Sequence, residues 1–285
     1  MFNCRLENKD GDIITLTQNE SDYQVLSIDG LNPPSAKINT ILTTSVDGAK
    51  FNSSKLETRN IVIRIKINGD IETNRLNLYN YCRTKDWSKF YYENGTRNIY
   101  IECYVEQVEC DLFTKNEIMQ ISLLCPNPYF KDLYVIYNDL SKIRKLFEFP
   151  FAIDSAGIEF SNYNYDSVIN IQNVSESESG IIITTNFKDS VGLVEIKNTS
   201  NGEYFKIDYD FIYGDKLIID TNKGEKSVVL IRNAVIINMF PYIIYGSTFF
   251  QLQQGDNYFT YLVDDLIYDD KVEMIIEHCN IYRGV

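Results

Sequence analysis

The feature that most constrains this fold is an alternation of apolar and polar side chains with a period of two. From Ile61 to Ile67, isoleucine occupies every second position, and the same alternation recurs from Ile99 to Val105 and from Met119 to Cys125. Successive side chains of a strand point to opposite faces of its sheet, so each stretch predicts a strand with one buried face. The 21 tyrosines and the many β-branched residues also suit pleated strands. We therefore predict a mainly β fold.

One helix is predicted between these strands. Asp70, preceded by Gly69, is a good N-cap residue, and we expect the helix to end near Lys85. The order of strands, one helix and further strands predicts an α+β N-terminal domain whose helix covers a sheet. Ile71, Arg75, Leu78 and Cys82 are expected to lie on one face of this helix.

A domain boundary is predicted after the third alternating stretch. Pro126 and Pro128 stop that strand, so we place the boundary between Tyr129 and Phe151 and divide the chain into domains 1–135 and 136–285. Turn signals such as Asn201-Gly202 then separate short strands, a pattern typical of a β-sandwich or jelly roll. The strands expected here are 168–171, 180–187, 191–197, 205–211, 217–219, 228–231 and 272–276.

The charge excludes two classes of partner. The chain has 27 basic and 40 acidic residues and a formal net charge of −13. Proteins that bind nucleic-acid phosphates or anionic membranes use lysine and arginine, so we expect neither specific nucleic-acid binding nor membrane binding. An acidic surface is also one that DNA can pass without binding.

Cysteine spacing and hydropathy exclude two further classes. None of the six cysteines forms a C-x-x-C pair, which argues against a structural zinc site and favours reduced, buried thiols. The chain begins without an apolar signal core. Its longest apolar stretch, residues 234–245, is interrupted by Asn238 and Pro241 and is too short to span a bilayer.

The residues that could carry catalysis are few. The single histidine, His278, is adjacent to Cys279, and neighbouring residues of a strand point to opposite faces, so they make a poor base–nucleophile pair. Acidic pairs occur at Asp208/Asp210, Asp264-Asp265 and Asp269-Asp270. They could serve glycoside hydrolysis or calcium binding, but solvated strand edges explain them better in so acidic a chain. We predict no enzyme activity, no metal site and no cofactor.

Several segments resemble a known family. Residues 26–34 read Leu-Ser-Ile-Asp-Gly-Leu-Asn-Pro-Pro, and the segments Lys37–Ile41, Ser45–Phe51 and Arg59–Ile63 follow. With Gln120–Phe130 they resemble the N-terminal part of the siphophage distal tail protein (Dit) family. In the second half, the resemblance rests on Gly214–Thr221 and Gly255-Asp256-Asn257.

The resemblance implies a fold and a role. The fold is a tail-tube-like β-sandwich with one helix, which forms rings, followed by an outward-facing sandwich like a galectin or carbohydrate-binding module. The implied role is a structural one, as a homohexameric ring with a central channel for DNA. The ring lies at the virion tail tip and is assembled in the cytoplasm of the host bacterium. Implied partners are the tail tube protein, the tail hub or tail-associated lysin, the tape measure protein and receptor-binding proteins.

A weakly apolar hairpin is our candidate for the subunit interface. Gly30 permits a tight turn, Pro33-Pro34 stiffen the exit from it, and Lys37–Phe51 reads as a long hairpin that turns near Asp47-Gly48. Its alternation is too loose for a buried strand, so we expect it to pair with a neighbouring subunit. The interface residues predicted are Ile38, Ile41, Leu42, Val46 and Phe51.

Three other functions stay open at this point. A carbohydrate-binding baseplate or receptor-recognition protein would carry an exposed aromatic cluster in a groove. A wall-degrading glycosidase would need two carboxylates facing each other across a cleft. The tail-tube subunit itself is the third alternative, although tube proteins rarely need a second domain of this kind.

Overall fold

The computed structural model describes residues 2–19, 21–42, 47–112, 117–140, 143–145, 161–163, 168–264 and 271–285. The chain forms two compact units. The first contains Met1–Leu133 together with Ile281–Val285, and the second contains Tyr134–Asn280. The segment Ile281–Val285, which the sequence-based division assigned to the second domain, therefore belongs with the first.

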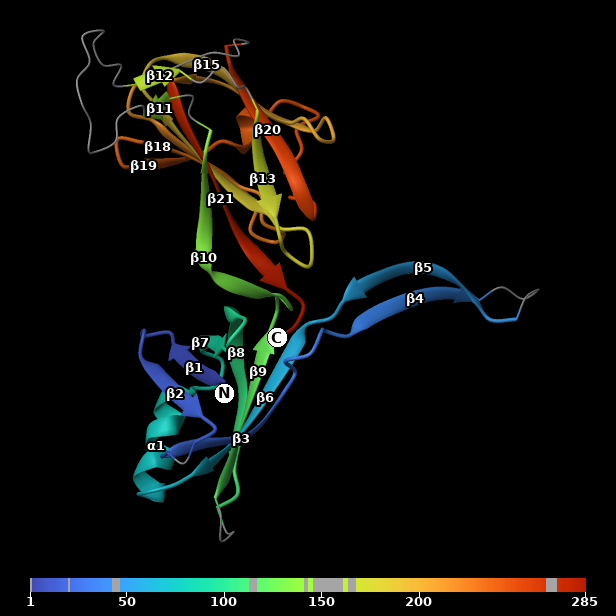
Figure 1. The fold of residues 1–285 in the computed structure, drawn as a ribbon, viewed down its shortest axis with the longest axis vertical. Coiled ribbons are helices and arrows are strands. Elements are labelled where there is room, and N and C mark those ends of the chain that lie inside the picture. The colour runs from blue at the N-terminus through green and yellow to red at the C-terminus, as the bar shows by residue number, and fades with distance from the viewer. Residues whose placement is uncertain are drawn as a thin grey trace, which may run out of the picture. The chain divides into compact units, whose positions relative to one another are not determined.

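The first unit is a sheet of mostly antiparallel strands that closes on itself. The order β8-β7-β1-β2-β3-β6-β9 is closed by a further pairing between β8 and β9, and β2 and β3 pair in parallel. Figure 1 shows these strands with the single helix beside them. The elements are β1 Asn3–Asn8, β2 Ile13–Thr17, β3 Tyr23–Asp29, β4 Ala36–Leu42, β5 Ala49–Leu56, β6 Arg59–Ile67, α1 Ile71–Tyr81, β7 Trp87–Glu93, β8 Asn98–Cys110 and β9 Ile118–Cys125.

The three alternating stretches form the core of this unit. Ile61, Ile63 and Ile65 of β6 are fully buried, and they lie opposite Leu123, Ile121 and Met119 of β9 in register. The residues between them on β6 are exposed or half-buried. The period-two pattern therefore predicted these strands and their buried faces correctly.

The helix begins where the sequence indicates. The carboxylate of Asp70 accepts a hydrogen bond from the Thr73 amide at 3.3 Å, which confirms the N-cap. The expected end near Lys85 is wrong, because α1 stops at Tyr81 and Lys85 has a positive φ of 75°, which a helix does not allow. The face expected to cover the sheet is only partly buried. Leu78 and Cys82 are buried, whereas Ile71, in the first turn, is exposed.

The second unit is a sandwich of two sheets, as predicted. One sheet has the order β19-β18-β17-β14-β21-β10 and the other β13-β20-β15-β16. The elements are β10 Phe130–Asp139, β11 Ile143–Lys145, β12 Ser161–Tyr163, β13 Ile169–Asn173, β14 Ile181–Phe187, β15 Val191–Asn198, β16 Tyr204–Phe211, β17 Lys216–Asp220, β18 Ser227–Arg232, β19 Val235–Asn238, the 3-10 turn Phe240–Tyr242, β20 Gly255–Val263 and β21 Val272–Tyr282.

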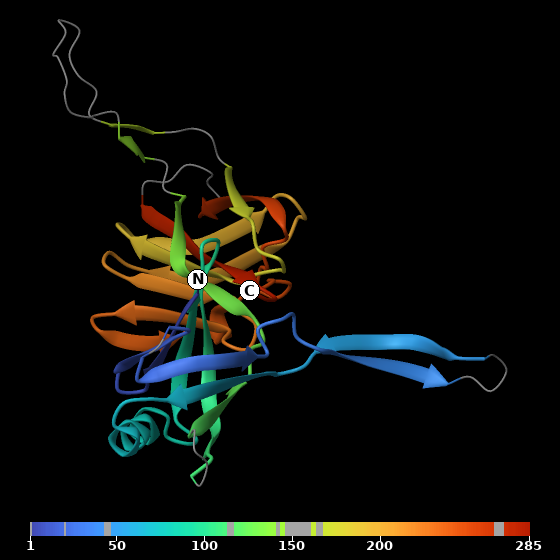
Figure 2. The ribbon, with the colours of Figure 1, turned by 60° about the horizontal axis from the view of Figure 1, so that its bottom comes forward.

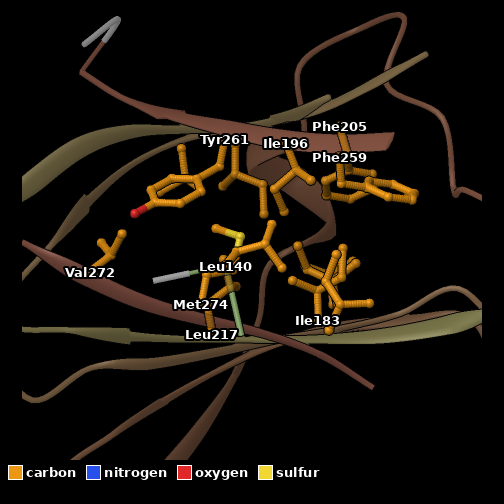
Figure 3. Close-up of a cluster of buried hydrophobic side chains, with 14 of the residues drawn as sticks. Leu140, Ile183, Ile196, Phe205, Leu217, Phe259, Tyr261, Val272 and Met274 are labelled. Carbon is orange, nitrogen blue, oxygen red and sulfur yellow. The ribbon is translucent and has the colours of Figure 1, made fainter. Parts of the chain in front are cut away.

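The core of the sandwich lies between its two sheets. Figure 3 shows Ile196, Phe205 and Phe259 of one sheet facing Ile183 and Leu217 of the other. Aromatic rings pack in pairs, with Phe187 and Phe211 stacked at 4.2 Å and Phe250 edge-on to Phe259 at 5.4 Å. Within the described residues, no helix is long and apolar enough to cross a membrane.

Candidate interface on the β4–β5 hairpin

The hairpin β4–β5 forms a two-stranded sheet of its own within the first unit. Its strands pair only with each other, from Ala36 opposite Leu56 to Leu42 opposite Ala49. Figures 1 and 2 show it extending away from the other strands of the unit. Every residue of the two strands is exposed except Leu56, which is half-buried. Isolated two-stranded hairpins are only marginally stable in water, so a surface that packs against this one would stabilise it.

The register of the hairpin sorts its side chains by polarity. Ile38 lies opposite Ser54, and Asn39 opposite Ser53, but a bulge then brings Thr40 opposite Phe51. Residues directly opposite each other share a face, and a shift of one residue moves a side chain to the other face. The bulge at Asn52 therefore places Phe51 on the face of β4 that carries Ile38 and Leu42.

The three large apolar side chains on this face are mostly exposed to solvent. The exposed fractions are 62% for Ile38, 83% for Leu42 and 61% for Phe51. Contiguous apolar patches on a protein surface mark sites of interaction. The structure thus brings three of the predicted interface residues together, and we call the face formed by Ile38, Leu42 and Phe51 the apolar face.

The remaining two predicted residues behave differently. Ile41 is also exposed, at 51%, but the register places it opposite Lys50 on the other face of the hairpin. That face carries Lys37 directly opposite Lys55 as well. Val46 lies outside the described residues.

The sequence alone could not reveal this sorting. The positions of Ile38 and Leu42, four residues apart on one strand, were a usable signal for a shared face. The lysine face and the position of Phe51 depend on the bulge at Asn52, and local composition does not encode that register.

The histidine and cysteines do not form a catalytic site. The ring of His278 is buried, which lowers its pKa, and its Nδ1 lies 3.2 Å from Nδ2 of Asn138. Cys279 points elsewhere and donates its thiol to the Tyr134 carbonyl at 3.8 Å. All six cysteines are free thiols, and burial raises the pKa of Cys4 and of Cys82 to about 12.

The acidic pairs have separate structural surroundings. Asp264 accepts hydrogen bonds from the amides of Gly192 and Leu193 at 2.8 and 3.0 Å, which fixes the end of β20. Asp265, Asp269 and Asp270 lie outside the described residues. Among the residues that the structure describes, no group of three or more histidine, cysteine or acidic side chains is placed to hold a metal ion.

Asp208 and Asp210 border an open depression in the second unit. Two tyrosine rings also line it, with Tyr209 edge-on to Tyr242 at 4.6 Å. Arg232 lines it too, with its guanidinium held by the carboxylate of Asp215 at 2.9 and 2.5 Å. The depression offers aromatic faces and carboxylates, which are groups that can contact sugar rings and hydroxyls.

Comparison with known proteins identifies the second unit. Residues 175–271 match the family described as siphovirus-type tail component, C-terminal domain. This segment, about a third of the chain, is therefore similar to the C-terminal domain of siphovirus-type tail components. No curated protein sequence matches the chain.

Solved structures extend the likeness to almost the whole of this chain. SPP1 Dit, described as a paradigm of the hub adsorption apparatus in phages that infect Gram-positive bacteria, has 12% sequence identity and a TM-score of 0.69. The alignment covers 98% of each chain. A chain of the phage P2 baseplate in its activated conformation has 11% identity and a TM-score of 0.53, over 97% of this chain and 98% of that one. The fold of this chain is therefore the Dit fold, as the sequence resemblance indicated.

Proposed function

We propose that this chain is a distal tail protein that forms a hexameric ring at the tail tip. The ring joins the tail tube to the tail hub or baseplate, anchors host-recognition components and leaves a central channel for DNA. Its role is structural and not enzymatic. The observation that carries the proposal is the alignment with SPP1 Dit over 98% of both chains, with a TM-score of 0.69.

The two units have different parts in this proposal. The first unit forms the ring, and the second faces outward. The tail tube protein and the tape measure protein lie above the ring, and the hub or tail-associated lysin lies below. Receptor-binding proteins attach at the periphery. The phage P2 baseplate likeness supports a place in such an assembly.

The hairpin supplies the contact between neighbouring copies in the ring. Its apolar face gains by leaving water, at about 1.5 kcal/mol or more for each large side chain that becomes buried. The edge strands of the hairpin also offer backbone groups to a neighbouring strand. Both gains require a second protein surface, because within the described residues the hairpin strands pair only with each other.

The acidic charge suits a channel that DNA traverses. Each copy has a formal net charge of −13, so six copies concentrate negative charge in one ring. Carboxylates on the channel wall would repel the DNA backbone and keep its passage free of binding. A cryo-EM reconstruction of the tail tip with a basic channel wall would remove this part of the proposal.

The oligomeric state is the first test of the ring. Light scattering on the purified 33.1 kDa chain over a range of concentrations gives the mass, and negative-stain imaging gives the shape. We expect six copies with six-fold symmetry and an open centre. A chain that stays monomeric in solution and also occupies no ring in a cryo-EM map of the assembled tail would contradict the proposal.

Carbohydrate binding by the second unit is the alternative function, and the depression at Asp208 and Tyr242 favours it. Titration of the protein with cell-wall polysaccharide, followed by calorimetry, tests this reading. Binding that is lost in Tyr242→Ala and Asp208→Asn would support it. Equal behaviour of the wild type and both variants would leave the depression without a role in recognition.

A further inference from the structure

A buried arginine joins the root of the hairpin to the last residues of the chain. Arg59 is the first residue of β6 and directly follows the return strand of the hairpin, separated from it only by Glu57 and Thr58. It is 3% exposed, and its guanidinium lies over the ring of Phe130 at 4.6 Å. Burial lowers the pKa of this side chain. Among the described residues, no carboxylate pairs with it.

The guanidinium instead donates to carbonyl oxygens from three separate segments. Nη1 binds the carbonyls of Gly30 and Asn32, at 2.5 and 2.7 Å, and both belong to the loop that leads into β4. Nε binds the carbonyl of Pro128 at 2.9 Å, and Nη2 binds the carbonyl of Arg283. A buried charge is costly unless its hydrogen bonds are satisfied, so this arrangement is held in place by its four acceptors together.

The terminal segment Ile281–Val285 is fixed to the same loop by further contacts. The amide of Val285 donates to the carbonyl of Leu31 at 3.2 Å. Arg97 donates to the carbonyl of Gly284 and lies over the ring of Tyr282 at 4.4 Å. Gly284 packs tightly on the same loop, since an added Cβ would lie 3.1 Å from Pro33 and its neighbours would have to shift by a few tenths of an ångström.

Two hydrogen bonds between Ser35 and Glu57 also join the two sides of the hairpin at its root. The amide of Glu57 donates to the carbonyl of Ser35 at 3.0 Å, and the Ser35 hydroxyl donates to the Glu57 carboxylate at 3.0 Å. These bonds join the two strands of the hairpin to each other. Arg59 joins the outgoing loop to Pro128 and to the terminal segment at once.

We infer that Arg59 is a positioning residue that sets the direction of the hairpin by locking its root to the terminal segment. This inference rests on the proposed function, because it assigns the lock to the assembly of the ring. β4 has seven residues. At about 3.3 Å per residue it reaches about 23 Å, so a tilt of about 10° at the root moves the tip by about 4 Å. A displacement of that size takes the apolar face out of contact with a neighbouring copy.

Three variants test the lock. Arg59→Met removes all four hydrogen bonds but keeps much of the packing on Phe130. Gly284→Val forces the terminal segment away from Pro33 and leaves the guanidinium itself unchanged. Arg64→Met is the matched control, since Arg64 lies on the same strand, is exposed and donates to the side chain of Gln120 away from the hairpin root. Circular dichroism at each temperature used confirms that every variant is folded.

Two measurements on these variants separate the lock from the ring. Hydrogen exchange of the Glu57 and Val285 amides, which donate to the Ser35 and Leu31 carbonyls, reports on the root alone when it is measured at a concentration below assembly. We expect exchange at least tenfold faster in Arg59→Met and Gly284→Val, and no change in Arg64→Met. Light scattering then gives the concentration for ring formation, which we expect to rise at least tenfold in the same two variants.

The outcomes distinguish the inference from the proposed function. Unchanged exchange of the Glu57 and Val285 amides in both variants would overturn the lock, and so would faster exchange with unchanged assembly. If the wild type forms no ring, the proposed function fails, and the link to assembly fails with it. Arg59→Lys gives the remaining check, since one ammonium group cannot reach all four carbonyls. A lysine that restored wild-type exchange and assembly would show that charge alone suffices and would overturn the lock.

Discussion

Replacement of Phe51 by serine should raise the concentration needed for ring assembly by about two orders of magnitude. Phe51 exposes 61% of its surface in the single chain. A phenylalanine can bury on the order of 200 Å², so about 120 Å² is available to a neighbouring copy. At about 25 cal/mol per Å², its burial contributes about 3 kcal/mol per contact, which corresponds to roughly a hundredfold change in the dissociation constant.

The assay is light scattering over a concentration series, with thermal unfolding measured in parallel. Phe51 is exposed, so the unfolding free energy of the single chain should change by less than about 0.5 kcal/mol. The matched control is Tyr213→Ser, which removes an exposed aromatic ring from the second unit. Assembly of Phe51→Ser at the wild-type concentration would refute the assignment of the apolar face to the interface.

Three other predictions concern the bulge, an ion pair and the thiols. Deletion of Asn52 should leave ring assembly intact, because Phe51 stays opposite Thr40 in the regular register; light scattering of the deletion variant checks this, and loss of assembly would mean that the bulge itself makes contact. Burial acts to raise the pKa of Asp215, but hydrogen bonds from Arg232 and the Ile212 amide outweigh it and hold the pKa below its usual value. Asp215→Asn should therefore lower the free energy of unfolding by about 2 kcal/mol at neutral pH. This difference shrinks as the pH falls below the unfolded-state pKa of about 3.9 and is lost as the pH falls through the lower folded-state pKa. Urea unfolding of both proteins over a series of pH values from 7 downward would show it. Finally, Cys4 and Cys82 should resist iodoacetamide at pH 8 in the folded protein, because burial raises the pKa of both thiols to about 12 and keeps them protonated; labelling of either in mass spectrometry would contradict this.

The strands with strong alternation could be predicted because their burial is one-sided. β6 and β9 each repeat an apolar residue every second position, and the structure buries those positions. The sandwich strands β14 to β18 were likewise indicated by short apolar runs between turn residues. In these elements local pattern and tertiary packing agree, so the sequence is sufficient.

Other features depend on residues far apart in the chain. β1, β2 and β20 were not predicted, because their apolar positions are fewer or mixed with polar ones, and pairing partners decide their structure. The four acceptors of Arg59 are carbonyl groups, one of them 224 residues away. Backbone carbonyls leave no trace in residue identity, so no reading of the sequence could have assembled that site.

The return of Ile281–Val285 to the first unit makes the second unit an insertion. The chain enters it within β10 and leaves it within β21, so two covalent connections, and not one flexible linker, attach it. Such an arrangement lets one module be exchanged for another while the host domain keeps its fold, provided that both crossing strands are retained. A peptide tag fused after Val285 would sit on the first unit beside the hairpin root. A tag placed in a loop of the sandwich would therefore report on assembly with less risk of disturbing it.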